Sequence, residues 1–291
     1  MKKQLLILFV KYGLGLGLLA GVIFSYWHNI QDDKEVGLAG VFERPLHLPY
    51  LALAVALALG SILLTFVRWY ILVRAQELPF TLPSALRLGM IGYYLSTFLP
   101  GAVGGDIIKA AFIAREQSRR TVAVTTVIMD RVMGLCGLIW LVALIGGYFW
   151  MTGLLATMAT AASAAAILET ILIGATVLTV GSILFWAVLG CLSQERAEGL
   201  RIWLRGVPKI GGPLGELWRA VWLYRCRGRS VGLALALSMI GHLGFVLVFY
   251  FASLTLNPAA SIPSLGAHFL LVPVGVTIAA GIPTPGGVGG G

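Results

Sequence analysis

Charged residues are scarce in this chain. Only 11% of its 291 residues are Asp, Glu, Lys or Arg, whereas 58% are hydrophobic. Soluble domains carry roughly 25% charged residues. The run from Tyr50 to Val67 contains no Asp, Glu, Lys, Arg or His. This composition excludes an ordinary soluble domain and predicts a polytopic membrane protein.

Cysteine and clustered metal ligands are also scarce. The three cysteines, Cys136, Cys191 and Cys226, have no paired spacing, so we expect free thiols and no structural disulfide. His242 and His268 lie in apolar runs without a second ligand at metal spacing, and an isolated histidine there usually bonds a neighbouring helix. The sequence also lacks a Ser/His/Asp set and an ATP-binding motif. We therefore expect no metal site, no cofactor and no enzymatic activity.

Six apolar runs approach the roughly 20 residues that a helix needs to cross the hydrocarbon core. They cover residues 5–26, 49–67, 121–148, 167–190, 231–254 and 265–281. Backbone groups in lipid must be satisfied within each segment, and the alternation typical of an outer-membrane barrel is lacking, so the runs predict helices. The first run is too long for a signal peptide, and we interpret it as an anchored helix. The predicted fold class is all-α, with residues 1–291 forming a single integral membrane domain.

Basic residues are concentrated in residues 191–229, which hold eight Lys or Arg against three Glu. The loop 31–47 instead holds four acidic residues against two basic ones. The positive-inside rule places residues 191–229 and the N-terminus in the cytoplasm, at the cell (inner) membrane. Anionic phospholipid, rather than nucleic acid, is the expected partner of this basic segment. Pro208 and Gly211-Gly212-Pro213 divide it into two short amphipathic pieces.

A Pro-Gly phrase occurs twice, at residues 100–105 and 285–290, each time directly after an apolar stretch. Paired interruptions of hydrophobic segments in the two halves of a chain indicate a transporter-type binding site and a possible internal repeat. Two ordinary loops are the alternative, because Gly and Pro are common in membrane-protein turns. The residues of these two glycine turns are Pro100, Gly101, Gly104, Gly105, Pro285, Gly286, Gly287 and Gly289.

Residues 82–106 are apolar and aromatic, yet the basic residues on both sides predict that this stretch returns to the side it left. A re-entrant hairpin of two half-helices, turning at Pro100, satisfies this constraint. An interfacial amphipathic helix satisfies it equally well.

Four charged residues are candidates for binding a lipid headgroup: Asp106, Lys109, Asp130 and Arg131. Asp106 is a natural capping residue for the helix after the first glycine turn, and Lys109 lies one turn further on. Asp130 and Arg131 lie about ten residues into an apolar run, where charges are functional candidates by default. The alternative is that this helix begins late and that both residues lie at the headgroup level.

Arg68 and Trp69 lie near the end of the second predicted span. A Trp ring and a basic side chain are ordinary anchors at a membrane–water interface. We therefore interpret this pair as an interfacial anchor.

The order of these motifs resembles a known family. Residues 94–106 (YLSTFLPGAVGGD), then Lys109-Ala110, then Asp130-Arg131 with Gly134, are similar to the transmembrane region of lysylphosphatidylglycerol synthases and their stand-alone, flippase-like relatives. Residues 282–289 (IPTPGGVG) resemble the second signature of that family. The family often has Glu where this chain has Asp130, a change that keeps the charge.

The resemblance implies movement of lipids with anionic or modified headgroups between leaflets, without the aminoacyl-transferase domain of the synthases. The four charged residues would line a headgroup cavity between the two broken segments. The family's second signature continues into a further helix, so we expect a truncation after Gly291. The alternatives are an accessory subunit that serves a partner enzyme of a lipid-linked glycosyltransferase or envelope-lipid pathway, a lipid transferase, and a small-solute transporter.

Overall fold

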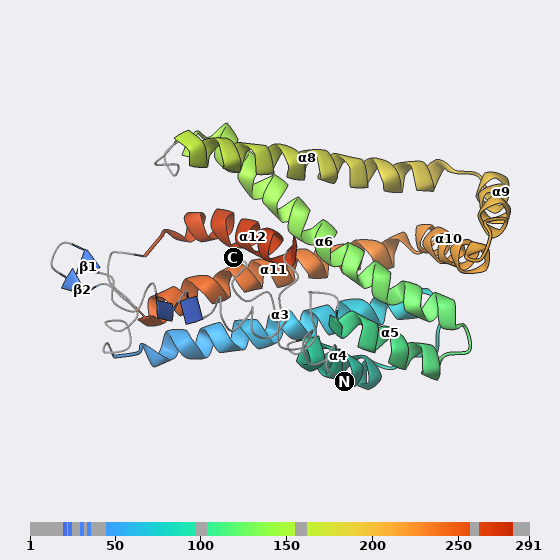
Figure 1. Ribbon diagram of the computed structural model, residues 1–291, viewed down its shortest axis with the longest axis horizontal. Coiled ribbons are helices and arrows are strands. Elements are labelled where there is room, and N and C mark those ends of the chain that lie inside the picture. The colour runs from blue at the N-terminus through green and yellow to red at the C-terminus, as the bar shows by residue number, and fades with distance from the viewer. Residues whose placement is uncertain are drawn as a thin grey trace, which may run out of the picture. The chain divides into compact units, whose positions relative to one another are not determined.

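The computed structural model describes residues 20–21, 23–24, 30–31, 34–35, 45–96, 104–154, 162–256 and 262–281. Apart from one short antiparallel pair, β1 (Ile30–Gln31) and β2 (Lys34–Glu35), the regular elements in these residues are helices (Figure 1). This confirms the all-α class for the described part of the chain. Most of the predicted first span lies outside the described residues, as do Pro100, Gly101, Pro285, Gly286, Gly287 and Gly289.

Four helices in the described residues are long and apolar enough to cross a membrane. They are α3 (Leu48–Ala75), α6 (Arg120–Met151), α8 (Ala162–Cys191) and α11 (Gly228–Leu256). Each contains one predicted span, because an apolar run of this length satisfies its backbone groups in lipid only as a helix. The last predicted span is helical too, as α12 (Leu265–Gly281), but its 17 residues are fewer than the roughly 20 that a crossing helix needs.

Two shorter helices begin within residues 82–106, the stretch that was predicted to return to its own side, and the second extends beyond it. They are α4 (Leu82–Ser96) and α5 (Gly104–Glu116). Arg87 on α4 pairs with Glu116 at the end of α5, with Nη2 and Oε1 3.4 Å apart. The two helices therefore lie against each other as a hairpin. Its insertion into the membrane stays a prediction.

The basic segment also forms two helices, α9 (Gln194–Arg205) and α10 (Gly211–Arg225). The break between them contains Pro208, which confirms the division predicted there, whereas Gly211, Gly212 and Pro213 form the first three residues of α10. At the start of α9, the Ser193 side chain accepts a hydrogen bond from the backbone N–H of Arg196. This contact satisfies one of the free N–H groups of the first turn and caps the helix.

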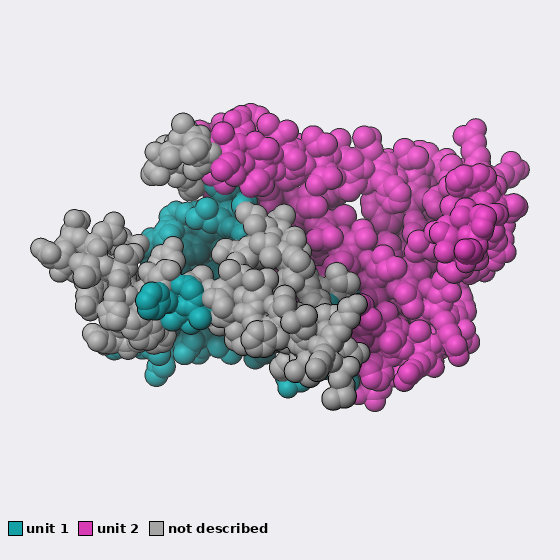
Figure 2. All heavy atoms as spheres, in the orientation of Figure 1, with its two compact units in different colours: residues 1–60, 91–106, 243–291 teal, residues 61–90, 107–242 magenta. Residues whose placement is uncertain are grey.

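Contacts within the chain divide it into two compact units (Figure 2). Unit 1 comprises residues 1–60, 91–106 and 243–291, and unit 2 comprises residues 61–90 and 107–242. Within unit 1, Oγ of Ser253 on α11 and Nε2 of His268 on α12 lie 3.3 Å apart. The prediction that this histidine bonds a neighbouring helix is confirmed.

Within unit 2, the C-terminal end of α3 and the N-terminal ends of α6 and α11 converge. Arg119, just before α6, donates from Nη1 to the carbonyl oxygen of Gln76, just after α3, at 3.3 Å. Arg227, just before α11, pairs with Glu77, which also follows α3. We call this region, which holds Arg119 and Arg227, the basic end of unit 2. Its assignment to the cytoplasm stays a prediction.

Candidate functional site

A buried ion pair joins α3 and α6 inside unit 2. Nε of Arg68 on α3 lies 2.8 Å from Oδ1 of Asp130 on α6, and the two side chains are only 8% and 6% exposed. Removing a charge from water in this way is strongly unfavourable unless a partner and further hydrogen bonds compensate it. The remaining polar contacts of these two groups therefore define the site.

Lys109 brings a second cation to the same carboxylate. Its Nζ, on α5, lies 3.4 Å from Oδ2 of Asp130, and its side chain is 12% exposed. The ammonium also lies 5.2 Å from the centroid of the Trp69 ring, within reach of a cation–π contact. The two oxygens of Asp130 thus face cations from two different helices. The 3.4 Å contact is longer than a strong charge-assisted hydrogen bond, so the Lys109–Asp130 contact is weaker than the Arg68–Asp130 contact.

Helix α11 completes the site. Nη1 of Arg68 donates to Oγ of Ser238 at 3.0 Å, and this hydroxyl donates to the carbonyl oxygen of Gly134 at 3.3 Å. Nε2 of His242, one turn further along α11, lies 3.0 Å from the same carbonyl oxygen, which confirms that this histidine bonds a neighbouring helix. A glycine on α6 permits the close approach of α11 to α6, because a Cβ at Gly137 would overlap the Ser238 side chain. We call Arg68, Lys109, Asp130 and Ser238 the ion cluster.

The ion cluster lies inside the long helices rather than at their ends. Arg68 is seven residues before the end of α3, and Asp130 and Ser238 are each ten residues after the start of α6 and α11. At 1.5 Å per residue, these groups lie about 10–15 Å from the basic end. The prediction that Arg68 and Trp69 form an interfacial anchor is therefore wrong, because both side chains are buried among the helices. The late start considered for the helix of Asp130 is also wrong, since α6 begins at Arg120.

The described glycines of the first glycine turn lie at the start of α5. The helix begins at Gly104, so Asp106 is the third residue of its first turn, and the predicted capping position is wrong by three residues. The negative charge of Asp106 still interacts favourably with the positive N-terminal end of the helix dipole. A Cβ at Gly105 would overlap the carbonyl oxygen of Gly92 on α4 within unit 1. Glycine is therefore required at this position for the close approach of the two helices.

Of the four predicted charged residues, the structure brings Lys109 and Asp130 into direct contact. Arg131 is half-buried on α6 and, as the sequence neighbour of Asp130, projects from a different face. Sequence reasoning missed Arg68 and Ser238 as members of the site. The sequence did contain one indication that Arg68 lies inside a helix span. Five further apolar or aromatic residues follow it and extend the apolar run beyond the charge.

Span-length apolar helices that enclose an arginine–aspartate pair define an integral membrane protein with a charged site inside its helix bundle. The chain belongs to the family described as the lysylphosphatidylglycerol synthase TM region, whose sequence model matches residues 14–291. This match spans nearly the whole chain and confirms the resemblance drawn from the glycine and charge motifs. Comparison with curated proteins and with solved structures returned no match.

Proposed function

We propose that this chain binds phospholipids with anionic or modified headgroups and moves them between the two leaflets. The observation that carries the proposal is the ion cluster, buried about 10–15 Å inside the helices of unit 2. Ionisable groups at such depth are unfavourable in lipid and mark substrate or ion pathways by default. The family name, which refers to a lipid-modifying enzyme, supports a lipid as the ligand.

Within the ion cluster, we assign Lys109 to the headgroup. Arg68 is fixed by two short hydrogen bonds, to Asp130 at 2.8 Å and to Ser238 at 3.0 Å. Lys109 contacts Asp130 at 3.4 Å and projects from the short helix α5 that follows the first glycine turn. A lipid phosphate would replace Asp130 as the partner of Lys109 and leave the Arg68 pair intact. Each charge would then keep a counter-ion with and without ligand.

The other predicted features have roles in the same proposal. Asp106 and Arg131 would line the path, and the two glycine turns would act as hinges or as cradles for the phosphate. The acyl tails would stay in the surrounding lipid. The chain would act without a cofactor and without enzymatic chemistry. We place it in the cell (inner) membrane with a cytoplasmic N-terminus, and residues 191–229 against inner-leaflet phospholipid.

Leaflet exchange of short-chain fluorescent phospholipids in proteoliposomes tests this proposal. The full chain should accelerate the exchange of phosphatidylglycerol relative to empty liposomes. Lys109→Gln should slow exchange at least about tenfold, because it removes a charge-assisted contact to the phosphate. Arg87→Gln is the matched control, since the Arg87 side chain is 66% exposed and pairs with Glu116 outside the ion cluster. It should exchange lipid like the wild type.

The outcomes separate the function classes. Exchange by the wild type and by Arg87→Gln, with loss in folded Lys109→Gln, would support translocation through the ion cluster. If folded wild-type protein shows no exchange above empty liposomes for any anionic headgroup, translocation is ruled out. Co-purification of a partner enzyme would then test the accessory-subunit alternative.

A further inference from the structure

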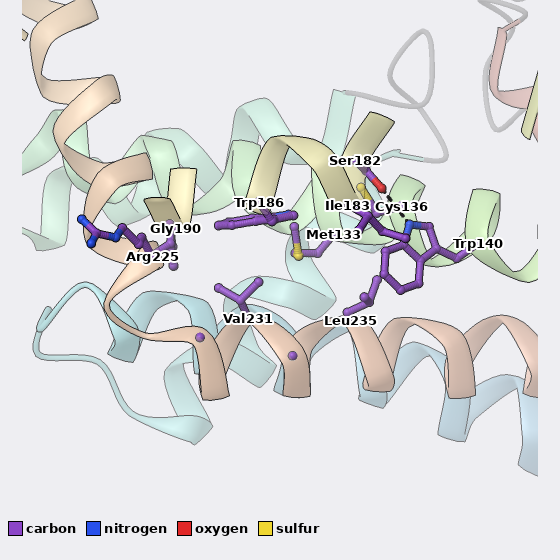
Figure 3. Close-up of a pocket in the computed structure, with 13 residues that line it drawn as sticks. Met133, Cys136, Trp140, Ser182, Ile183, Trp186, Gly190, Arg225, Val231 and Leu235 are labelled. Atoms are coloured by element: carbon purple, nitrogen blue, oxygen red, sulfur yellow. Dashed lines mark hydrogen bonds between the residues drawn. The ribbon is translucent and has the colours of Figure 1, made fainter. Parts of the chain in front are cut away.

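A cavity of about 360 Å³ lies within unit 2, between α6, α8, α10 and α11 (Figure 3). This volume falls in the roughly 300–1,000 Å³ range of small-molecule sites. Helix α8 packs tightly on α6 near their connection, where Leu172 occupies the space that a Cβ at Gly146 would need. Towards its C-terminal end α8 diverges from α6 (Figure 1), and the cavity lies in this region. Its main side chains are Met133, Trp140, Trp186, Arg225, Val231 and Leu235.

The interior of the cavity is apolar, and its polar groups are bonded to the protein. Nε1 of Trp140 donates to Oγ of Ser182 at 2.8 Å, and this hydroxyl donates to the carbonyl oxygen of Thr179 at 2.7 Å. The Tyr224 hydroxyl donates to a backbone carbonyl of α3, and burial raises the pKa of this phenol well above its ordinary value. Cys136 is a free thiol, as predicted, and behaves as a small apolar group. A ligand in this cavity would therefore gain binding free energy by burying hydrocarbon.

One end of the cavity carries a positive charge. Figure 3 shows Arg225 and Gly190 at one end, and Trp140 and Ser182 at the other. Gly190 and Ser182 are eight residues apart on α8, so the cavity extends about 12 Å along this helix. The Arg225 guanidinium lies 4.3 Å from the centroid of the Trp222 ring, and this cation–π contact holds the charge in place. Arg225 ends α10, two residues before Arg227 of the basic end.

From these features we infer that the cavity binds one acyl chain of an anionic phospholipid, with the lipid phosphate at Arg225. The apolar walls accept the hydrocarbon chain, and the guanidinium selects an anionic headgroup over a neutral one. This lipid is a resident ligand rather than the transported one, because the thirteen lining residues include Arg225 but not Arg68, Lys109 or Asp130. The inference goes beyond the proposed function and holds whether or not the chain translocates lipid.

Photochemical cross-linking in lipid nanodiscs tests the site. The full chain is placed in phosphatidylcholine nanodiscs with a small fraction of phosphatidylglycerol that carries a diazirine in one acyl chain. After irradiation, mass spectrometry locates the adducts on the protein. We expect adducts at Met133 and Val231, which line the cavity. The matched phosphatidylcholine probe should give about fivefold fewer, because one basic residue near an anionic headgroup contributes about 1 kcal/mol.

Two pairs of variants separate this site from general lipid contact. A Cβ meets nothing within 4 Å at Gly232, which lines the cavity, or at Gly181, which does not, so a side chain can begin at either position without a clash. Gly232→Leu should place its side chain in the cavity and lower the adduct yield there, whereas Gly181→Leu should leave that yield unchanged. Arg225→Gln should lower the phosphatidylglycerol adducts about fivefold. Arg229→Gln, an exposed position near the same end, should not.

Lower adduct yields in the cavity of Gly232→Leu and of Arg225→Gln, with both controls like the wild type, would support the inference. The inference is overturned if adducts are spread along exposed α8 residues such as Phe185 and Val188 with equal yield from both probes. Equal yields in all four variants would also overturn it. If Gly232→Leu does not fold, the adduct yield of Arg225→Gln relative to Arg229→Gln decides whether the inference holds. The readout is binding, so its failure is distinguishable from a failure of leaflet exchange.

Discussion

Asp130→Asn is the substitution that most directly tests the ion cluster. Asparagine has nearly the shape of aspartate but carries no charge, so the change removes the ion pair without opening a cavity. Arg68 and Lys109 would then face a neutral amide in place of the carboxylate that each contacts. The guanidinium of Arg68 would stay buried beside a group that no longer compensates its charge, and this is the source of the expected destabilisation.

Removing one partner of a buried ion pair lowers the free energy of unfolding by about 3–5 kcal/mol. The Arg68 and Asp130 side chains are so little exposed that water screens the pair only weakly. The amide oxygen of asparagine still accepts a hydrogen bond, so we expect a loss near the lower limit, about 3 kcal/mol. The surface pair Arg87–Glu116 is the comparison, with side chains 66% and 37% exposed. Glu116→Gln should lower the free energy of unfolding by less than about 1 kcal/mol.

Reversible unfolding of the purified chain in mixed micelles, with a denaturing detergent and tryptophan fluorescence as the signal, measures both variants. The double variant Arg68→Gln/Asp130→Asn should recover part of the loss, because neither charge of the pair remains buried. If Asp130→Asn and Glu116→Gln agree within about 0.5 kcal/mol, the effect of an ordinary surface substitution, then the reasoning about the buried pair is refuted.

Two further predictions concern packing and use the same unfolding assay. Gly137→Leu should lower the free energy of unfolding by about 1–3 kcal/mol or more, because its Cβ would overlap Ser238, whereas Gly147→Leu faces open space and should have little effect. Equal stabilities would contradict this reading of the α6–α11 contact. Tyr224→Phe should lower the free energy of unfolding by about 1–3 kcal/mol, because it leaves the backbone carbonyl of Leu72 without its donor. An unchanged unfolding curve would show that this hydrogen bond contributes little.

The long helices could be predicted because their cause is local. An apolar run in lipid must satisfy its own backbone N–H and C=O groups, so residues 49–67, 121–148, 167–190 and 231–254 each lie within an observed helix. The division of the basic segment is equally local, since Pro208 lacks the backbone N–H that would continue the hydrogen bonds of α9. The start of α5 was predicted three residues too late, because Gly104, Gly105 and Asp106 already belong to the helix.

The partners of the buried charges could not be predicted in the same way. Arg68 and Asp130 are 62 residues apart, and Arg68 and Ser238 are 170 apart. A single arginine near the end of an apolar run has the same sequence pattern as an interfacial anchor. Only the rotation of α3 relative to α6 distinguishes an arginine that faces the headgroups from one that faces a carboxylate.

The sequence by itself determined that this is a helical membrane protein of a known family, and it singled out Lys109 and Asp130 as charges of interest. Tertiary structure alone decided that Arg68 completes the ion cluster and that α8 leaves a cavity beside α6. The physical reason is the range of the interactions. Backbone hydrogen bonds in a span are made within one segment, whereas a buried charge or an unfilled volume depends on which helices meet and how closely.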